Sequence, residues 1–249
     1  MIRSFSLLLP LASIMLVQTA HANLVTNGGF DTGDFAGWTL FTTPNGSLGK
    51  TPGLPNVLSF DVTGGGASNA AQFQVGQAAF ILGAEEGGGI QQDIITPAGI
   101  AVLHADIAAF VPAIPDFIGG NSEGGVFSLL LDDVSVDSFT TGFVIGGVPL
   151  DSALDFTGPI SAGIHTLEIL VTRPFATGTG ENETPFQYVD NVSLDVEATP
   201  AIPEPSALAL LGGPSPALYS AAADGSGGLT GPVTESGFNV RCLSAKRLN

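Results

Sequence analysis

The stretch FQYVDNVSLDV, residues 186–196, decides the fold class because its apolar residues recur at every second position. Successive side chains of a β-strand point to opposite faces, so this period predicts a strand with one apolar face. That face is predicted to carry Phe186, Tyr188, Asp190, Val192, Leu194 and Val196.

The rest of the chain between residues 57 and 196 has the same character. Short runs of Val, Ile, Leu, Phe and Thr alternate with turn residues, and the whole sequence holds 34 Gly and 17 Pro without a helical periodicity. The sequence predicts an all-β fold, a two-sheet antiparallel jelly-roll sandwich. Its expected strands are residues 57–62, 71–82, 89–95, 100–111, 125–131, 134–139, 165–172 and 186–196.

The first 22 residues have the pattern of a secretory signal peptide. Arg3 is followed by an apolar run at residues 7–17 and by the small-x-small sequence Ala20-His21-Ala22. Signal peptidase is the expected first partner, and cleavage would leave Asn23 as the mature N-terminus. The sandwich domain is then expected at residues 23–198.

Charge and cysteine content limit the possible partners. There are 23 Asp and Glu against 6 Lys and Arg, a formal net charge of −17. Nucleic acids are excluded as partners because phosphate contacts require Lys and Arg. The single cysteine, Cys242, allows no internal disulfide, so an exported domain must be held by its core or by a metal ion.

Asp190 is the notable residue of the opening stretch, because it falls on the apolar face. A carboxylate removed from water costs several kcal/mol unless it is paired or binds metal. Two alternatives follow. Asp190 is a ligand of a hard cation such as calcium, or a β-bulge or a sheet end lets it face outward or accept backbone N–H groups.

Enzyme signatures are weak. Residues 120–124 match the nucleophile-elbow string around Ser122, and Asp155 and His165 follow in hydrolase order, but a strand-like run follows Ser122 where the motif needs a helix. A glycosidase needs two opposed carboxylates. The adjacent acidic residues Glu85-Glu86 and Asp132-Asp133 could be proposed for this role, but with so many acidic residues in the chain that choice is arbitrary. We therefore expect a non-catalytic protein, with a secreted hydrolase as the less favoured alternative.

The start and the end of the domain resemble the galactose-binding-like jelly-roll domains of secreted bacterial proteins, which include carbohydrate-binding modules. The matching positions are Asn27, Gly29, Phe30, Asp31, Gly37, Trp38, Asp190, Asn191 and Val192. The resemblance implies a structural calcium ion held by Asp31 and Asp190, and it makes a carbohydrate-binding module the alternative function. It identifies no ligand-binding residue, and Trp38 is expected in the core because an indole buries so much area.

The segment IPEPSALALLGG, residues 202–213, resembles the PEP-CTERM sorting region through Pro203, Glu204 and Pro205. That resemblance implies processing by an exosortase and a place at the cell surface, or in the biofilm matrix with extracellular polysaccharide. A membrane helix needs about 20 apolar residues, and here only residues 207–211 precede two glycines and two prolines.

The chain therefore lacks a complete anchor in this segment. Residues 199–213 are interpreted as a linker and truncated sorting signal, and residues 214–249 as a disordered tail. A reading-frame shift near Gly213 and a decayed anchor are the two hypotheses for this tail. We expect an exported protein of the periplasm, cell surface or exterior, with a binding or structural domain.

Overall fold

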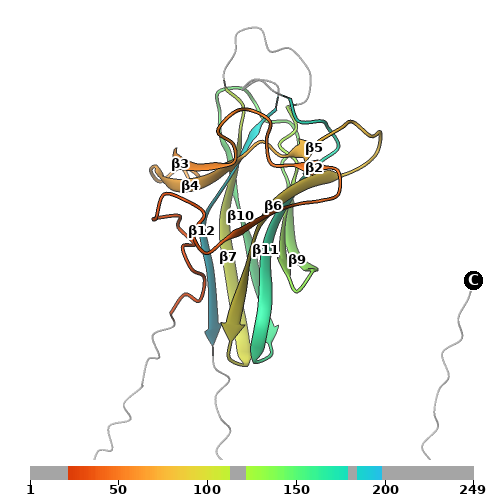
Figure 1. Ribbon diagram of the computed structural model, residues 1–249. Helices are drawn as coiled ribbons and strands as arrows, with labels where there is room; N and C mark the ends of the chain where they lie inside the picture. The colour runs from red at the N-terminus through yellow and green to blue at the C-terminus, as the bar shows by residue number, and fades with distance from the viewer. Residues whose placement is uncertain (1–21, 113–121, 179–183, 198–249) are drawn as a thin grey trace, which may run out of the picture. The chain divides into compact units, whose positions relative to one another are not determined.

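A computed structural model describes residues 22–112, 122–178 and 184–197, which form two antiparallel sheets (Figure 1). The first sheet has the order β1 (Thr39–Thr42), β6 (Glu86–Thr96), β11 (Gly163–Arg173), β8 (Val126–Leu131) and β9 (Val134–Thr140). The second sheet has the order β10 (Leu150–Ile160), β7 (Gly99–Phe110), β12 (Phe186–Glu197), β4 (Ser68–Phe73) and β3 (Asn56–Phe60). A small ladder pairs β2 (Gly46–Ser47) with β5 (Gly76–Gln77). The expected all-β jelly-roll sandwich is confirmed.

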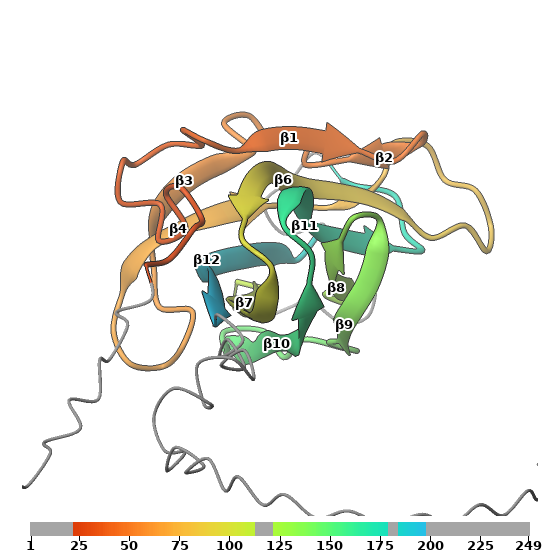
Figure 2. The same cartoon turned by 90° about the horizontal axis from the view of Figure 1, so that it is seen from below.

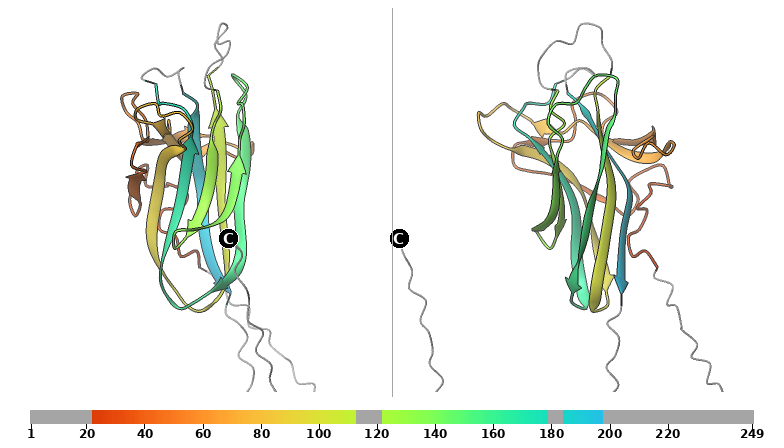
Figure 3. Two further views of the ribbon diagram at one scale, coloured as in Figure 1. Left: turned by 90° about the vertical axis from the view of Figure 1, so that its right-hand side faces the viewer. Right: turned by 180° about the vertical axis from the view of Figure 1, so that it is seen from behind.

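The core lies between the two sheets, which face each other when the molecule is viewed from one end (Figure 2). In β7, buried and partly buried residues alternate from Gly99 to Ile107, as a strand with one face against a core requires. The long strands of both sheets run along one direction (Figure 3). The largest fully buried apolar side chains are Phe30, Phe73, Phe127, Ile90, Leu103, Ile107, Leu129, Leu154, Leu167, Ile169 and Leu194.

Several strand predictions differ from the structure, since the short strands β1 and β2 also lie before the first expected strand. β10 was not expected, because Gly158 and Pro159 obscure its pattern. It is an edge strand that pairs only with β7 in its sheet, and an edge tolerates a proline without an N–H group. The strand predicted at residues 71–82 ends at Phe73, and the short β5 follows separately.

The predicted face of β12 is wrong beyond Asp190. A β-bulge shifts the register between Asp190 and Ser193, and one extra residue moves every following side chain to the opposite face. Val192, Leu194 and Val196 therefore belong to the core between the sheets, whereas Tyr188 packs in a second cluster on the outer face.

Residues 23–38 pack against the bulge. The Asn23 amide donates to the Val192 carbonyl, and its oxygen accepts from the Leu194 N–H at 3.1 Å. Val192 N–H in turn donates to the Gly28 carbonyl at 2.9 Å. A Cβ atom at Gly28 would lie 1.9 Å from the Val192 carbonyl oxygen, so only glycine allows this approach.

Trp38 is buried, as predicted. Its ring stacks on Phe30 with centroids 6.0 Å apart, and its indole N–H donates to the Asn27 carbonyl at 3.1 Å. Phe30 itself has no exposed surface and a φ of +51°, so the turn is strained in order to insert the ring. Both aromatic rings belong to the core between the sheets.

Several sequence predictions fall outside the described residues. They are the predicted signal peptide apart from its last residue, Ala22, the sorting signal Pro203, Glu204 and Pro205, and the tail at residues 214–249. Among the described residues, no helix has the length and apolar character needed to cross a membrane.

Candidate functional site

The outer face of the second sheet carries an aromatic shelf formed by Phe60, Phe110, Phe186 and Tyr188. Three strands, β3, β7 and β12, supply these rings. Phe60 lies flat on Tyr188, with centroids 3.6 Å apart and planes at 5°, and its centroid is 5.8 Å from that of Phe110. The small side chains of Ala70 and Ala108 beneath the rings allow this packing.

The shelf is an apolar surface on a polar sheet face. Tyr188 is buried, and its hydroxyl accepts a hydrogen bond from the Gln72 amide at 2.8 Å. Burial raises the pKa of Tyr188 to about 12, so the phenol stays neutral. The three phenylalanines remain partly exposed. Aromatic surface beside a few fixed polar groups is the usual composition of a small-molecule site.

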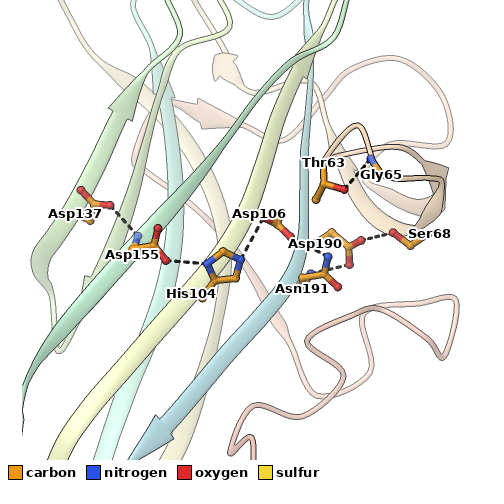
Figure 4. Close-up of polar contacts among 9 residues, drawn as sticks. All are labelled: Thr63, Gly65, Ser68, His104, Asp106, Asp137, Asp155, Asp190 and Asn191. Atoms are coloured by element: carbon orange, nitrogen blue, oxygen red, sulfur yellow. Dashed lines mark hydrogen bonds and ion pairs between the residues drawn. The ribbon is translucent and has the colours of Figure 1, made fainter.

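A row of polar side chains crosses the same face beside the shelf (Figure 4). It consists of Asp155 on β10, His104 and Asp106 on β7, Asn191 and Asp190 on β12, and Ser68 on β4. Asp137 on β9 joins the row across the sheet edge, since its Oδ2 accepts from the Asp155 N–H at 2.8 Å. The row therefore ties both sheets together.

Asp190 is fully buried on this outer face. Its carboxylate accepts from the Ser68 hydroxyl at 2.5 Å and from the Asn191 N–H at 2.7 Å. Burial raises the pKa of Asp190, the two hydrogen bonds oppose that rise, and the negative charges of Asp106 and Asp31 add to it. Of the two sequence-based alternatives, the second is met in part. The bulge is present and Asp190 accepts one backbone N–H, but the bulge turns Asn191 outward and leaves Asp190 buried.

Asp31 and Asp190 therefore lie close enough for the charge of one to affect the other, although 159 positions separate them in the sequence numbering. The two basic side chains of the described segments lie elsewhere. Lys50 donates to the Ala78 carbonyl at 2.6 Å, and Arg173 donates to the carbonyls of Glu123 and Val75. Across residues 22–112, 122–178 and 184–197, no group of three or more His, Cys, Asp or Glu is arranged to hold a metal ion.

His104 sits between two carboxylates. Its Nδ1 is 2.8 Å from Asp155 Oδ1, and its Nε2 is 3.2 Å from Asp106 Oδ1. Carboxylates only accept hydrogen bonds, so both contacts are satisfied only when both ring nitrogens carry protons. Burial lowers the pKa of His104, but the hydrogen bonds and charges of Asp155 and Asp106 outweigh burial and raise it overall.

The residues of the nucleophile-elbow match do not come together. Ser122 accepts from the Val144 N–H through its carbonyl, Asp155 binds His104, and His165 binds Asp132 at 2.6 Å. Both ring nitrogens of His165 face oxygen atoms, because Nε2 lies 3.1 Å from the Ser161 carbonyl. His165 therefore braces two turns.

The adjacent carboxylate pairs are also engaged separately. Glu86 accepts from the Thr43 hydroxyl, and the hydrogen bond from His165 lowers the pKa of Asp132. Burial raises the pKa of Glu85, and the charge of Glu123 adds to this.

No protein-family model matches this sequence, and no curated protein is significantly similar to it. Among solved structures, the chain is similar to TmCBM61, whose complex with beta-1,4-galactotriose is known, at 14% identity and a TM-score of 0.41, covering 71% of this chain and 99% of that one. It is similar to the mannan-recognising carbohydrate-binding module TmCBM27 at 13% identity and a TM-score of 0.41, covering 72% and 97%. The CBM22-1 xylan-binding domain from Paenibacillus barcinonensis Xyn10C follows at 8% identity and a TM-score of 0.37, covering 74% and 99%. No ligand is assigned from these similarities.

The sequence analysis missed the aromatic shelf and the polar row. Phe60 and Phe110 were assigned only to strands, and nothing marks them as neighbours on an outer face. One signal was present. His104 and Asp106 are two positions apart in a strand pattern, which places two ionisable groups on one face.

The raised pKa of His104 predicts a pH-dependent contribution to stability. Folding favours the charged ring, so the stabilisation is fully present below the ordinary histidine pKa of about 6.5. It is lost as the pH rises through the higher pKa of the folded protein. His104→Gln should therefore lower the melting temperature more at about pH 5.5 than at about pH 9. Thermal melts of both proteins across this range check the prediction, and a difference that is constant or grows with pH would contradict it.

Proposed function

We propose that this protein is a non-catalytic binding protein whose second sheet takes a neutral carbohydrate on its outer face. The observation that carries the proposal is the aromatic shelf beside the polar row on one rigid sheet face. Apolar faces of sugar rings pack on aromatic rings, and their hydroxyl groups bond to fixed polar side chains, which is the division of roles found in small-molecule sites. The resemblance of residues 23–38 and 190–192 to galactose-binding-like domains supports the same function.

The negative charge of the face favours uncharged ligands over anionic ones. Asp106, Asp155 and Asp190 lie in the row, and the whole chain has a net charge of −17. A uronate or sulfated glycan would bring like charges together, which costs binding free energy. Neutral glycans avoid this repulsion.

A glycan array followed by titration calorimetry tests the proposal. We expect binding to a neutral glycan and weak or no binding to uronic-acid polymers. Phe60→Ala should weaken binding several-fold to about tenfold, because an aromatic contact contributes about 0.5–1.5 kcal/mol. Phe143→Ala is the matched control, since that ring is 75% exposed in the connection between β9 and β10 and does not belong to the shelf. Absence of glycan binding, or equal loss in both variants, would reject the function.

We also propose export and the PEP-CTERM class for this chain. The support is the arrangement of a signal-peptide pattern, a sandwich domain and the motif Pro203, Glu204 and Pro205. Signal peptidase and exosortase are the implied processing partners, and extracellular polysaccharide of the cell surface or matrix is the implied surrounding. Intact-mass analysis after expression in a Gram-negative host should show a mature protein that begins at Asn23. A cytoplasmic product that retains Met1 would contradict export.

A structural calcium ion is the proposed cofactor, held by Asp31 and Asp190. The donors fit, because calcium prefers carboxylate and carbonyl oxygens. Burial raises the pKa of the fully buried Asp190, and the like charges of Asp106 and Asp31 add to this rise. A cation at this position would offset their repulsion and stabilise the packing of the N-terminal segment on β12.

Calcium is expected to raise the melting temperature of chelator-treated protein. Asp31→Asn should abolish this response, and it should also raise the stability of the calcium-free protein because one of the repelling charges is removed. Asp151→Asn, a change of an exposed aspartate on β10, is the matched control and should leave the response intact. Melting curves of the wild-type protein that do not change with calcium would contradict the proposed calcium site.

A further inference from the structure

A pocket of about 240 Å³ opens on the second sheet next to the aromatic shelf. It is separate from the polar row and lies at the opposite side of the shelf, where β3 begins and β4 ends. Asn56 and Gln72 are directly paired positions of these two strands and contribute their amide side chains to it. We call it the amide pocket, and it is lined by Thr51, Pro52, Gly53, Leu54, Asn56, Gln72 and Phe186.

The wall opposite Phe186 is a rigid turn. Leu54 N–H donates to the Thr51 carbonyl at 3.2 Å, Pro52 occupies the second position, and Gly53 has a φ of +91°. This is the residue pattern of a type II turn, in which the third position needs a positive φ. The Thr51 hydroxyl donates to the buried Gln74 at 2.6 Å, which attaches the turn to β4 and its continuation. A wall held this way loses little entropy when a ligand binds.

Asn56 lines this pocket and carries an unmet hydrogen-bonding group. Its Oδ1 is buried, and it has no hydrogen-bond partner among the described residues. A buried acceptor without a partner costs about 1–3 kcal/mol. As it lies, the oxygen is shielded from the pocket, and only rotation of the amide about its last torsion angle, which exchanges its oxygen and nitrogen positions, would turn the oxygen toward a donor bound there. Gln72 beside it is held in place, since its nitrogen donates to the Tyr188 hydroxyl.

The volume and the walls define the ligand. Pockets for drug-sized molecules measure about 300–1,000 Å³, so this smaller space fits one ring and not a chain. Phe186 offers one aromatic wall and continues into the shelf, because its centroid is 6.4 Å from that of Tyr188. A glycan that enters the pocket with one ring would therefore place its next ring over the shelf.

We propose that the amide pocket is the specificity subsite for a single neutral sugar ring, one hydroxyl of which donates to the side-chain oxygen of Asn56. This inference rests on the proposed glycan-binding function and adds the position and the hydrogen-bond acceptor that select the sugar. Asn56 is then a specificity residue, the Thr51–Leu54 turn positions the ring, and the shelf supplies affinity for the rest of the chain.

Nuclear magnetic resonance of the ¹⁵N-labelled protein tests the subsite with methyl glycosides of glucose, galactose, mannose and xylose as probes. We expect one glycoside to shift the side-chain amide signals of Asn56 and Gln72 in a saturable manner. Asn56→Leu should raise the Kd of that glycoside at least tenfold. Asn56→Asp should bind more tightly than Asn56→Leu, because its carboxylate oxygen still accepts from a hydroxyl. Thermal melts of both variants establish that they are folded.

Phe60→Ala separates this inference from the function beneath it. It should weaken binding of the array glycan more than it weakens binding of the methyl glycoside. If the array glycan binds and depends on Phe60, but Asn56→Leu binds it equally and no glycoside shifts the two amide signals, the subsite is refuted while the function stands. If neither glycan nor glycoside binds, both are refuted.

Discussion

The approach of Gly28 to Val192 is the contact on which the rest of the site depends. The missing side chain at Gly28 lets the N-terminal segment hydrogen-bond to β12 just after the bulge, where a Cβ atom would collide with a carbonyl oxygen. The same segment inserts Phe30 and Trp38 into the core and brings Asp31 toward Asp190. One close backbone contact thus joins the start of the domain to its last strand.

The bulge gives β12 two functions along its length. Beyond the bulge, its apolar residues fill the space between the sheets. Before the bulge, Phe186, Tyr188 and Asp190 face outward and build the second cluster and the polar row. A regular strand would have sent all of these side chains to one side, and the outer face would lack its aromatic centre. The irregularity of β12 therefore places aromatic and polar side chains on the outer face of a strand that also serves the core.

Charged and apolar side chains lie next to each other on this one sheet face. The imidazole of His104 bridges carboxylates on β7 and β10, and Asn191 continues the row to Asp106 at 2.8 Å. Hydrogen-bonded neighbours hold each polar group in one orientation, which is the condition for selective binding at low entropic cost. The shelf and the amide pocket lie on the same sheet, so a glycan would meet a rigid surface with different chemistry at each end.

The sequence by itself determined the fold class, because period-two apolar runs between turns have few solutions other than a sandwich of antiparallel strands. It also identified Trp38 as core and Asp190 as a carboxylate in an apolar strand, since both depend on local composition. Tertiary structure alone decided which side of β12 each residue occupies, because a bulge is set by pairing with β7 and by the docked N-terminal segment. It alone placed β10, whose Gly158 and Pro159 are acceptable only at a sheet edge. Phe60, Phe110 and Phe186 lie on three strands far apart in the chain, so their meeting on one face follows from strand order, which no local pattern encodes.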